Sequence, residues 1–198
     1  MKFNPDKKLD PRQRRTRGLI KDAFEQLLGE KAFDSITIQD IAERATVNRT
    51  TFYDHFDDKY ALMDFSFEDA FHKMLTHSNL EVFHYSDDNL KHLVRKTCEF
   101  LVDFQGQCPS SNHNLMPRFE IKITSQLHRI LLHWLSQGKH SELSEMEASV
   151  TSWAVYGAAY HWKKVHRQIS LEAYVEQVMP IIMKSMTIPQ VEYATSVR

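Results

Sequence analysis

The segment Thr37–Lys59, TIQDIAERATVNRTTFYDHFDDK, constrains the fold more than any other part of the chain. It predicts two short helices joined by a tight turn. Thr37 is suited to N-cap the first helix, and Asn48 the second, because each side-chain oxygen can accept from a free backbone N–H of the first turn. The apolar residues of the first helix recur at helical spacing on one face: Ile38, Ile41, Ala42 and Ala45.

The second helix begins at Arg49 and carries Phe52 and Phe56 four residues apart, so both rings are expected to face the core. Hydrogen-bonding side chains then point partly or wholly outward: Arg49, Thr50, Thr51, Tyr53 and His55. Two helices that cross through a tight turn, with such side chains at the start of the second, are typical of a DNA-binding helix-turn-helix.

The segment TIQDIAERATVNRTTFYDHFDDKYAL, residues 37–62, closely resembles the N-terminal signature of the TetR/AcrR family of bacterial transcriptional regulators. The resemblance implies an all-α protein of about nine helices in two domains. Residues 1–59 would form a three-helix DNA-binding domain with a basic N-terminal arm. Residues 60–198 would form a helical effector-binding and dimerisation domain.

Carried over position by position, the resemblance implies these DNA-binding residues: Thr37, Gln39, Asn48, Arg49, Thr50, Thr51, Tyr53, His55 and Lys59. Arg49 can bind guanine O6 and N7 with two hydrogen bonds, worth roughly 1–3 kcal/mol of discrimination. Hydroxyl and backbone N–H groups at Thr37 and Asn48 suit a phosphate at a helix start.

Two residues depart from the family pattern. Thr46 stands where the family often has glycine, so either the backbone is left-handed and strained there or the turn has another shape. Asp54 lies on the outward half of the second helix and repels phosphate. It either accepts from a cytosine amino group or points away from the DNA.

Charge is distributed unevenly along the chain. The 198 residues have a net charge of −1, which by itself does not suggest nucleic acid. Residues 1–21, however, hold eight basic side chains against Asp6 and Asp10. We expect this segment to be an arm attracted to phosphate and mobile up to about Pro11.

Beyond a helix that Asp58 can cap, helical patterns cover residues 90–104, 117–138, 144–165 and 170–186. Ser144 and Glu147 form a capping box, Ser170 caps the last helix, and Pro180 should bend it. The last two helices have wide apolar faces, which fit a homodimer through residues 146–186. Such a dimer would bind double-stranded DNA at an inverted repeat. The alternative is that these faces belong to the core of a single chain.

A small-molecule effector would bind among aromatic and apolar residues of the C-terminal domain: Phe100, Phe104, Phe119, Leu127, Trp134, Trp153, Tyr156 and Tyr160. Each of these residues also fits a core position. We expect a repressor that the effector releases from its operator. An activator of the same fold, a helical interaction module without DNA binding and a small helical enzyme are the alternatives.

Other classes find little support. No apolar run is long enough to span a membrane and the N-terminus is charged, so we expect a cytoplasmic protein. Phosphate-loop, H-E-x-x-H and G-x-S-x-G motifs are absent from the sequence, and we predict neither an enzyme nor a cofactor. The histidine pairs are five residues apart, which disfavours a metal site on one helix face. A zinc site built from separate helices, with Cys98 or Cys108, is a minor alternative.

Overall fold

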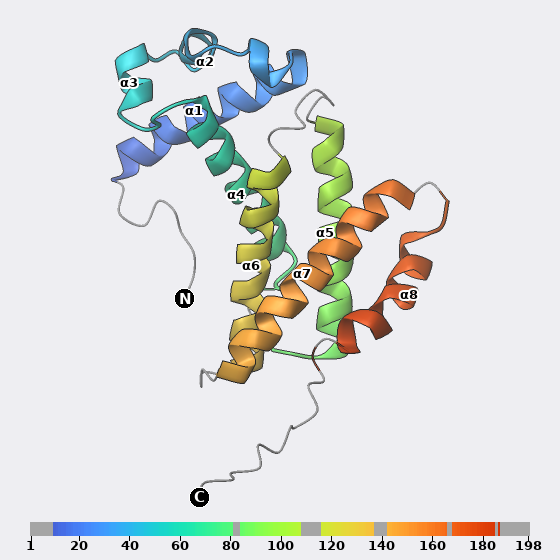
Figure 1. Cartoon of the computed structure of the whole chain (residues 1–198). Helices are drawn as coiled ribbons and strands as arrows, with labels where there is room; N and C mark the ends of the chain where they lie inside the picture. The colour runs from blue at the N-terminus through green and yellow to red at the C-terminus, as the bar shows by residue number, and fades with distance from the viewer. Residues whose placement is uncertain are drawn as a thin grey trace, which may run out of the picture. The chain divides into compact units, whose positions relative to one another are not determined.

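The computed structural model describes residues 10–80, 84–107, 116–136, 142–165, 168–184 and 186. These residues form helices and connections without any strand, which confirms the all-α prediction (Figure 1). The described part contains eight α-helices and one 3-10 turn, η1: α1 (Pro11–Glu30), η1 (Phe33–Ser35), α2 (Ile38–Arg44), α3 (Arg49–Tyr53), α4 (Lys59–His77), α5 (Asp87–Gln107), α6 (Met116–Ser136), α7 (Glu142–Val165) and α8 (Leu171–Lys184).

The chain packs as two compact units. The first comprises residues up to His77 together with Val102–Ile123, and the second comprises Ser78–Leu101 together with Thr124–Arg198. The helix α4 therefore packs with the predicted helix-turn-helix, while α5 and α6 each contribute to both units. A functional boundary at residue 59 stays a prediction.

The helix α1 begins at Pro11, within the basic N-terminal segment. Asp10 caps the helix by accepting from the N–H groups of Arg12 (2.7 Å) and Gln13 (3.0 Å), and Pro11 occupies the first helical position. The Gln13 side chain accepts in turn from the N–H of Asp10, which completes a capping box. The basic segment that we expected to be an arm is thus helical from Pro11 onward, and residues 1–9 lie outside the described part.

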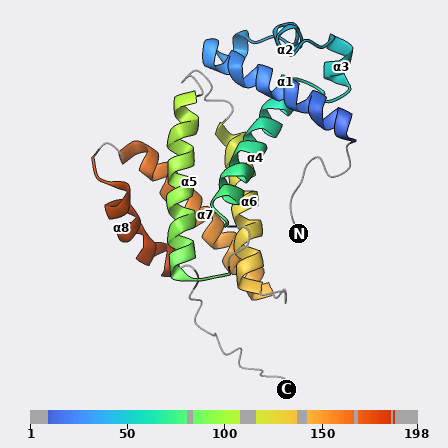
Figure 2. The ribbon, with the colours of Figure 1, turned by 180° about the vertical axis from the view of Figure 1, so that it is seen from behind.

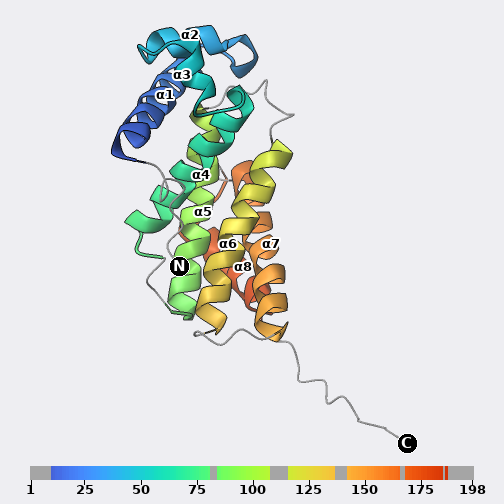
Figure 3. The same cartoon turned by 90° about the vertical axis from the view of Figure 1, so that its left-hand side faces the viewer.

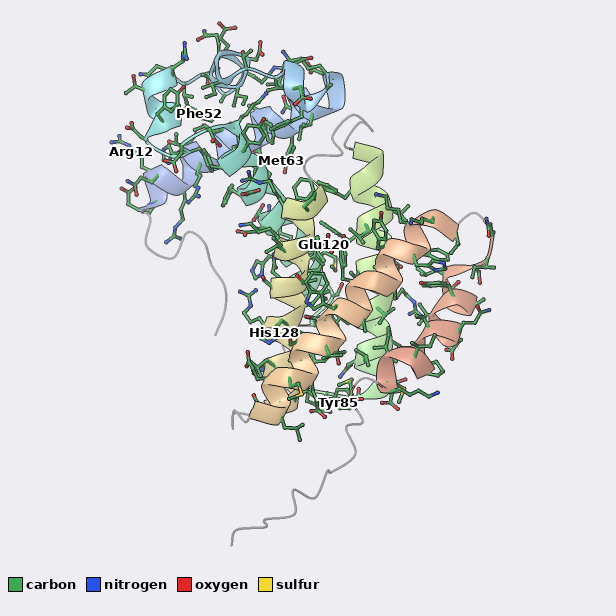
Figure 4. The ribbon with its side chains drawn as sticks, in the orientation of Figure 1. Arg12, Phe52, Met63, Tyr85, Glu120 and His128 are labelled. Atoms are coloured by element: carbon green, nitrogen blue, oxygen red, sulfur yellow. The ribbon has the colours of Figure 1, made fainter. Side chains whose placement is uncertain are left out.

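In the first unit, α2 and α3 lie on one side of α1 (Figure 1). Their apolar faces meet over a shared core, in which the ring of Phe52 points inward while Arg12 lies on the outside at the start of α1 (Figure 4). The buried side chains of this core include Ile20, Phe24, Leu27, Ile41, Ala42, Phe52, Phe56, Leu62 and Phe65. The predicted inward positions of Phe52 and Phe56 are confirmed.

The turn between α2 and α3 has the left-handed backbone that the sequence left open. Thr46 has a φ of 55°, although threonine is β-branched and such residues rarely adopt positive φ. The N–H of Thr46 donates to the Glu43 carbonyl (3.1 Å) and that of Val47 to the Ala42 carbonyl (3.0 Å), which together form a Schellman motif. Thr46 occupies the position where such motifs favour glycine, so this turn is strained.

The second unit is held by contacts among its own helices. The indole N–H of Trp134 on α6 donates to the Leu80 carbonyl (3.2 Å), and Lys91 on α5 pairs with Glu176 on α8 (2.9 Å). The hydroxyl of Tyr174 on α8 donates to the Ala158 carbonyl of α7 (2.7 Å). The views from behind and from the side show α8 beside α5 and α6 beside α7 (Figures 2 and 3).

The ends of the last helices test three local predictions. Ser170 caps α8 by accepting from the N–H of Ala173 (3.2 Å), and Pro180 lies inside that helix, as predicted. The prediction that α7 begins at Ser144 is wrong, because the helix already begins at Glu142. Ser144 therefore lies within the first turn.

We predict that Thr46→Gly stabilises the protein. Glycine adopts positive φ without a steric cost, so the substitution relieves strain of the order of 1 kcal/mol in the free energy of unfolding. Thr46→Ala, which keeps a Cβ atom, should gain less. Urea denaturation of the three proteins measures the effect, and a Thr46→Gly protein no more stable than Thr46→Ala would contradict it.

Candidate nucleic-acid interface

The helix α2 is fixed against the C-terminal part of α1 at both of its ends. At its start, the Thr37 hydroxyl and the Asp40 carboxylate form a capping box, and Lys31 pairs with that carboxylate (2.8 Å). At its end, Arg44 forms two hydrogen bonds to the Glu30 carboxylate (2.7 and 2.8 Å). The hydrogen bonds from Lys31 and from the backbone and hydroxyl of Thr37 lower the pKa of Asp40 far below its usual range.

The helix α3 follows from the cap that the sequence predicted. The Asn48 side chain accepts from the N–H of Thr51 (2.7 Å), and Phe52 is the residue of α3 that is buried. Arg49, Thr50 and Tyr53 are exposed, Tyr53 by 48%. Arg49 has no hydrogen-bond or ion-pair partner among the described residues, so its guanidinium is available to a ligand.

The nine predicted DNA-binding residues lie close together along the chain, at the start of α2, on α3 and just after it. Six are exposed and three are partly exposed, the latter being Thr51, His55 and Lys59. Four of the nine have side chains already engaged within the protein: Thr37 in its capping box, Gln39 with Glu43, Asn48 as the cap of α3, and Lys59. Contact of any of them with DNA stays a prediction.

Lys59 differs from the other eight because its charged group is bound to three backbone carbonyls of the protein. Its ammonium group donates to the carbonyl oxygens of Phe33 (2.9 Å), Asp34 (3.2 Å) and Ile36 (2.9 Å). An ammonium group has three N–H donors, so the carbonyls occupy all of them. Lys59 therefore has an internal role in this structure, in addition to the phosphate contact that the resemblance implies.

The acidic side chains after α3 divide into two roles. Asp58 accepts from the N–H of Ala61 (2.7 Å) and caps α4, as predicted. Asp54 and Asp57 are exposed, and Asp54 is the C-terminal cap residue of α3. On this part of the chain the exposed arginine, Arg49, thus lies at the N-terminal end of α3, and the exposed acidic side chains lie at and after its C-terminal end.

The structure adds basic residues on α1 to this surface region. Arg12, Arg14 and Arg15 are exposed in the first turns of α1, which packs against α2. We expected them on a basic arm attracted to phosphate that is mobile up to about Pro11. The signal that this expectation missed is the run Asp10-Pro11-x-Gln13, which combines a capping box with proline at the first helical position.

The predicted effector-binding residues are distributed over both units. In the first unit, Phe104 and Phe119 pack with Phe67, with ring centroids 4.4 to 4.9 Å apart. In the second unit, Leu127 and Trp134 are buried, whereas Trp153 and Tyr160 are 50% and 40% exposed on α7. Tyr156, which lies between Trp153 and Tyr160 in the sequence, is buried, and Phe100 on α5 is half-buried. The exposed Trp153 and Tyr160 face solvent in the single chain.

Metal, redox and membrane features can be checked in the described residues. Among them, no three His, Cys, Asp or Glu side chains are grouped closely enough to hold a metal ion. Burial, with Glu99 nearby, raises the pKa of the Cys98 thiol to about 12, and Cys108 lies outside the described part. No described helix combines the length and the hydropathy needed to cross a bilayer.

Two short helices joined by a tight turn, with the second presenting a free arginine and hydroxyl groups at its capped start, define a helix-turn-helix DNA-binding domain. Residues 20–64 match the model of the tetR family of bacterial regulatory proteins. The match covers the helix-turn-helix and the helices beside it, so this part of the chain is similar to the DNA-binding part of these transcriptional regulators.

Comparison with individual proteins agrees with this assignment. An uncharacterised HTH-type transcriptional regulator, YxbF of Bacillus subtilis strain 168, is 41% identical over 59 residues, which are 29% of this chain and 16% of the length of that relative. A TetR transcriptional regulator from Streptococcus agalactiae 2603V has a similar structure (TM-score 0.55, 22% identity, 86% of this chain and 95% of that one). RolR in complex with resorcinol is similar too (TM-score 0.55, 18% identity, 90% and 96%). The two structures show the common fold.

We predict that Asn48→Ala destabilises the protein by about 1 kcal/mol, because it leaves the first turn of α3 without its cap. Asn48→Asp keeps an acceptor oxygen and should retain most of the stability. Guanidinium denaturation of both variants measures the effect. Equal losses in the two would mean that the Asn48 oxygen does not stabilise α3.

Proposed function

We propose that this chain is a cytoplasmic transcriptional regulator, rather than an enzyme, that binds an inverted-repeat operator as a homodimer and is released by a small molecule. The observation that carries the proposal is the exposed guanidinium of Arg49 on a capped α3, which no described residue pairs with, inside the region that matches the tetR family. Arginine at such a position can read guanine in the major groove. Thr50 and Tyr53 are exposed beside it and suit phosphate or base contacts.

The basic residues at the start of α1 would add sequence-independent affinity. Arg12, Arg14 and Arg15 are exposed within one turn of the helix and would lie near phosphate when α3 enters the groove. Asp54 and Asp57 would oppose a closer approach of the C-terminal end of α3. This division places base reading at Arg49 and Thr50.

Dimerisation is supported by the exposed face of α7. The prediction left two readings of the apolar surface of this helix, and the structure contains both kinds of face. One is covered by the chain itself, through Ala148, Val155, Ala159 and Trp162. The other is exposed and has apolar residues three and four apart in alternation: Leu143 (48% exposed), Met146 (55%), Val150 (48%), Trp153 (50%) and Tyr160 (40%).

With Gly157 between Trp153 and Tyr160, the spacing alternates between three and four residues throughout, as in a helix–helix seam, and we name these six residues the α7 seam. No described atom lies within 4 Å of the position that a Cβ atom would take at Gly157, so packing among the described residues does not require glycine there. A mid-helix glycine costs roughly 1 kcal/mol relative to alanine. Close approach of a partner helix would explain its presence.

Charge favours an antiparallel arrangement of the two α7 helices. Glu145 is exposed near the N-terminal end of α7 and Lys164 near its C-terminal end. Antiparallel pairing places opposite charges side by side, whereas parallel pairing places like charges together. A two-fold axis near Trp153 would then bring the seam of each helix onto that of its partner.

The effector would act by differential affinity for two dimer geometries. A coupling free energy of about 1–3 kcal/mol is enough to change operator affinity roughly 5- to 150-fold. RolR, whose structure contains resorcinol, shares the fold and supports a small-molecule effector for this chain. The family match does not distinguish repression from activation, which depends on where the operator lies relative to the promoter.

We predict that Arg49→Ala abolishes operator preference and leaves the melting temperature nearly unchanged, because Arg49 is exposed and unpaired. The operator can be obtained by selecting bound fragments from the source genome, and its position also separates a repressor from an activator. Fluorescence anisotropy on the operator and on a scrambled duplex then measures preference.

Arg12→Ala is the matched control, since it removes the same charge from an exposed position on a different helix, α1. It should weaken binding to both duplexes about equally. If Arg49→Ala behaves in the same way as Arg12→Ala, Arg49 does not read bases. If the unmodified protein prefers no fragment, the proposed function itself is wrong.

We also predict that Val150→Glu combined with Trp153→Glu converts the dimer to a folded monomer, because four carboxylates would be buried in one interface. Sedimentation equilibrium measures the mass, and circular dichroism checks the fold. Ser125→Glu, at an exposed position on α6, serves as the control and should leave the dimer intact. An unmodified chain that sediments as a monomer at all concentrations would contradict the seam.

A further inference from the structure

The segment that follows α3 is tied to the start of the helix-turn-helix through Lys59. The carbonyls that accept from its ammonium group belong to the short connection between α1 and α2, which contains η1 and ends at the Thr37 cap. The Lys59 nitrogen also lies 4.6 Å from the centroid of the Phe33 ring, and Phe33 is 1% exposed. The first residue of α4 is thereby joined to the residues just before α2.

A second tie comes from Arg17 on α1. Its guanidinium carbon lies 4.9 Å from the Phe56 ring centroid and 4.2 Å from that of Phe65. Phe56 also packs against Phe52, the buried residue of α3, with centroids 5.9 Å apart. The Arg17 guanidinium therefore lies over the Phe56 ring, which packs against the buried Phe52 of α3.

The helix α3 depends on these contacts of Lys59 and Arg17 because it is very short. α3 has five residues and Phe52 as its buried side chain. An isolated helix of this length is unstable, and a single buried ring cannot fix the direction of a helix axis. The angle of α3 is therefore set from its two flanks, by the Thr46 turn before it and by Phe56 and Lys59 after it.

We propose that Lys59 and Arg17 are positioning residues that hold α3 at the angle needed to read bases, without contacting the DNA backbone themselves. This inference rests on the proposed function. A lysine bound to phosphate would have to release at least one of its three carbonyl partners, since its donors are all in use. Loss of the tie should then lower specificity rather than general affinity.

The test is Lys59→Met in the full-length chain, because methionine keeps an unbranched apolar stem and removes the donors. Operator and scrambled duplexes are titrated at several salt concentrations. We expect operator affinity to fall roughly tenfold, the size of effect of losing hydrogen bonds to a charged group. Scrambled-duplex affinity and the slope of log K against log salt should remain as in the unmodified protein.

A phosphate contact gives a different pattern. Affinity would then fall for both duplexes alike, and the magnitude of the salt slope would fall by about 0.9. That result, or unchanged operator affinity, overturns the proposal for Lys59. Arg17→Met should reproduce the Lys59→Met pattern, and Arg12→Met should give the phosphate pattern, which calibrates the assay with the same charge change.

A second variant covers the case in which Lys59→Met does not fold. Lys59→Arg keeps the positive charge, but its planar guanidinium does not match three carbonyls arranged around one point. Positioning predicts reduced operator preference for Lys59→Arg and faster hydrogen exchange at the amides of Phe52 and Tyr53 in the absence of DNA. Phosphate contact predicts unmodified operator preference and exchange. An unmodified protein without any operator preference refutes the proposed function instead.

Discussion

Side chains that satisfy the free backbone groups of short helices are the interaction on which the helix-turn-helix depends. Each helix end leaves several N–H or C=O groups without a partner, and α2 and α3, with seven and five residues, consist largely of such ends. Thr37, Asn48 and Asp58 cap the starts of α2, α3 and α4 in turn. The ammonium group of Lys59 donates to backbone carbonyls before α2. Lys59 thus satisfies backbone acceptors, whereas the three caps satisfy backbone N–H donors.

The helix α4 connects this small domain to the rest of the first unit by both polar and aromatic contacts. Lys21 on α1, 8% exposed, pairs with Asp69 on α4 (3.3 Å). Burial lowers the pKa of Lys21, but Glu25 and Asp69 outweigh it and leave the pKa raised. On α6, Arg118 pairs with Asp64 (2.7 Å) and Lys122 with Glu68.

These ion pairs differ in what they contribute. The two between α4 and α6 are partly exposed and each adds little stability, on the order of 1 kcal/mol or less. They repeat at four-residue spacing on both helices, and Phe67 stacks on Phe119 beside them (4.4 Å), so they fix the register of α4 against α6. Loss of Asp69, by contrast, would remove a partner from a buried ammonium, which is costly.

The sequence predicted those features that depend on near neighbours. The two helices, the Asn48, Asp58 and Ser170 caps and the inward rings of Phe52 and Phe56 all follow from spacing within a few residues. The start of α1 was open to the same reasoning, since the Asp10 capping box is local. Thr46 was recognised as a departure, but two turn shapes were compatible with it.

Contacts between distant parts of the chain could not be predicted in this way. The carbonyl partners of Lys59 lie 23 to 26 residues before it, and nothing in the local pattern distinguishes an ammonium that binds carbonyls from one that binds phosphate. Periodicity also gave one apolar stripe on α7, whereas the structure has a covered face and an exposed one. The aromatic residues expected around an effector divide between the two units for the same reason.

The unequal burial of the tryptophans has a practical consequence. Trp134 and Trp162 are 1% and 6% exposed, whereas Trp153 is half exposed on the α7 seam. An indole in water emits at longer wavelength than one in an apolar environment and is open to collisional quenchers such as acrylamide. The chain thus carries an intrinsic optical reporter on that face, and covering of the face can be followed without a dye.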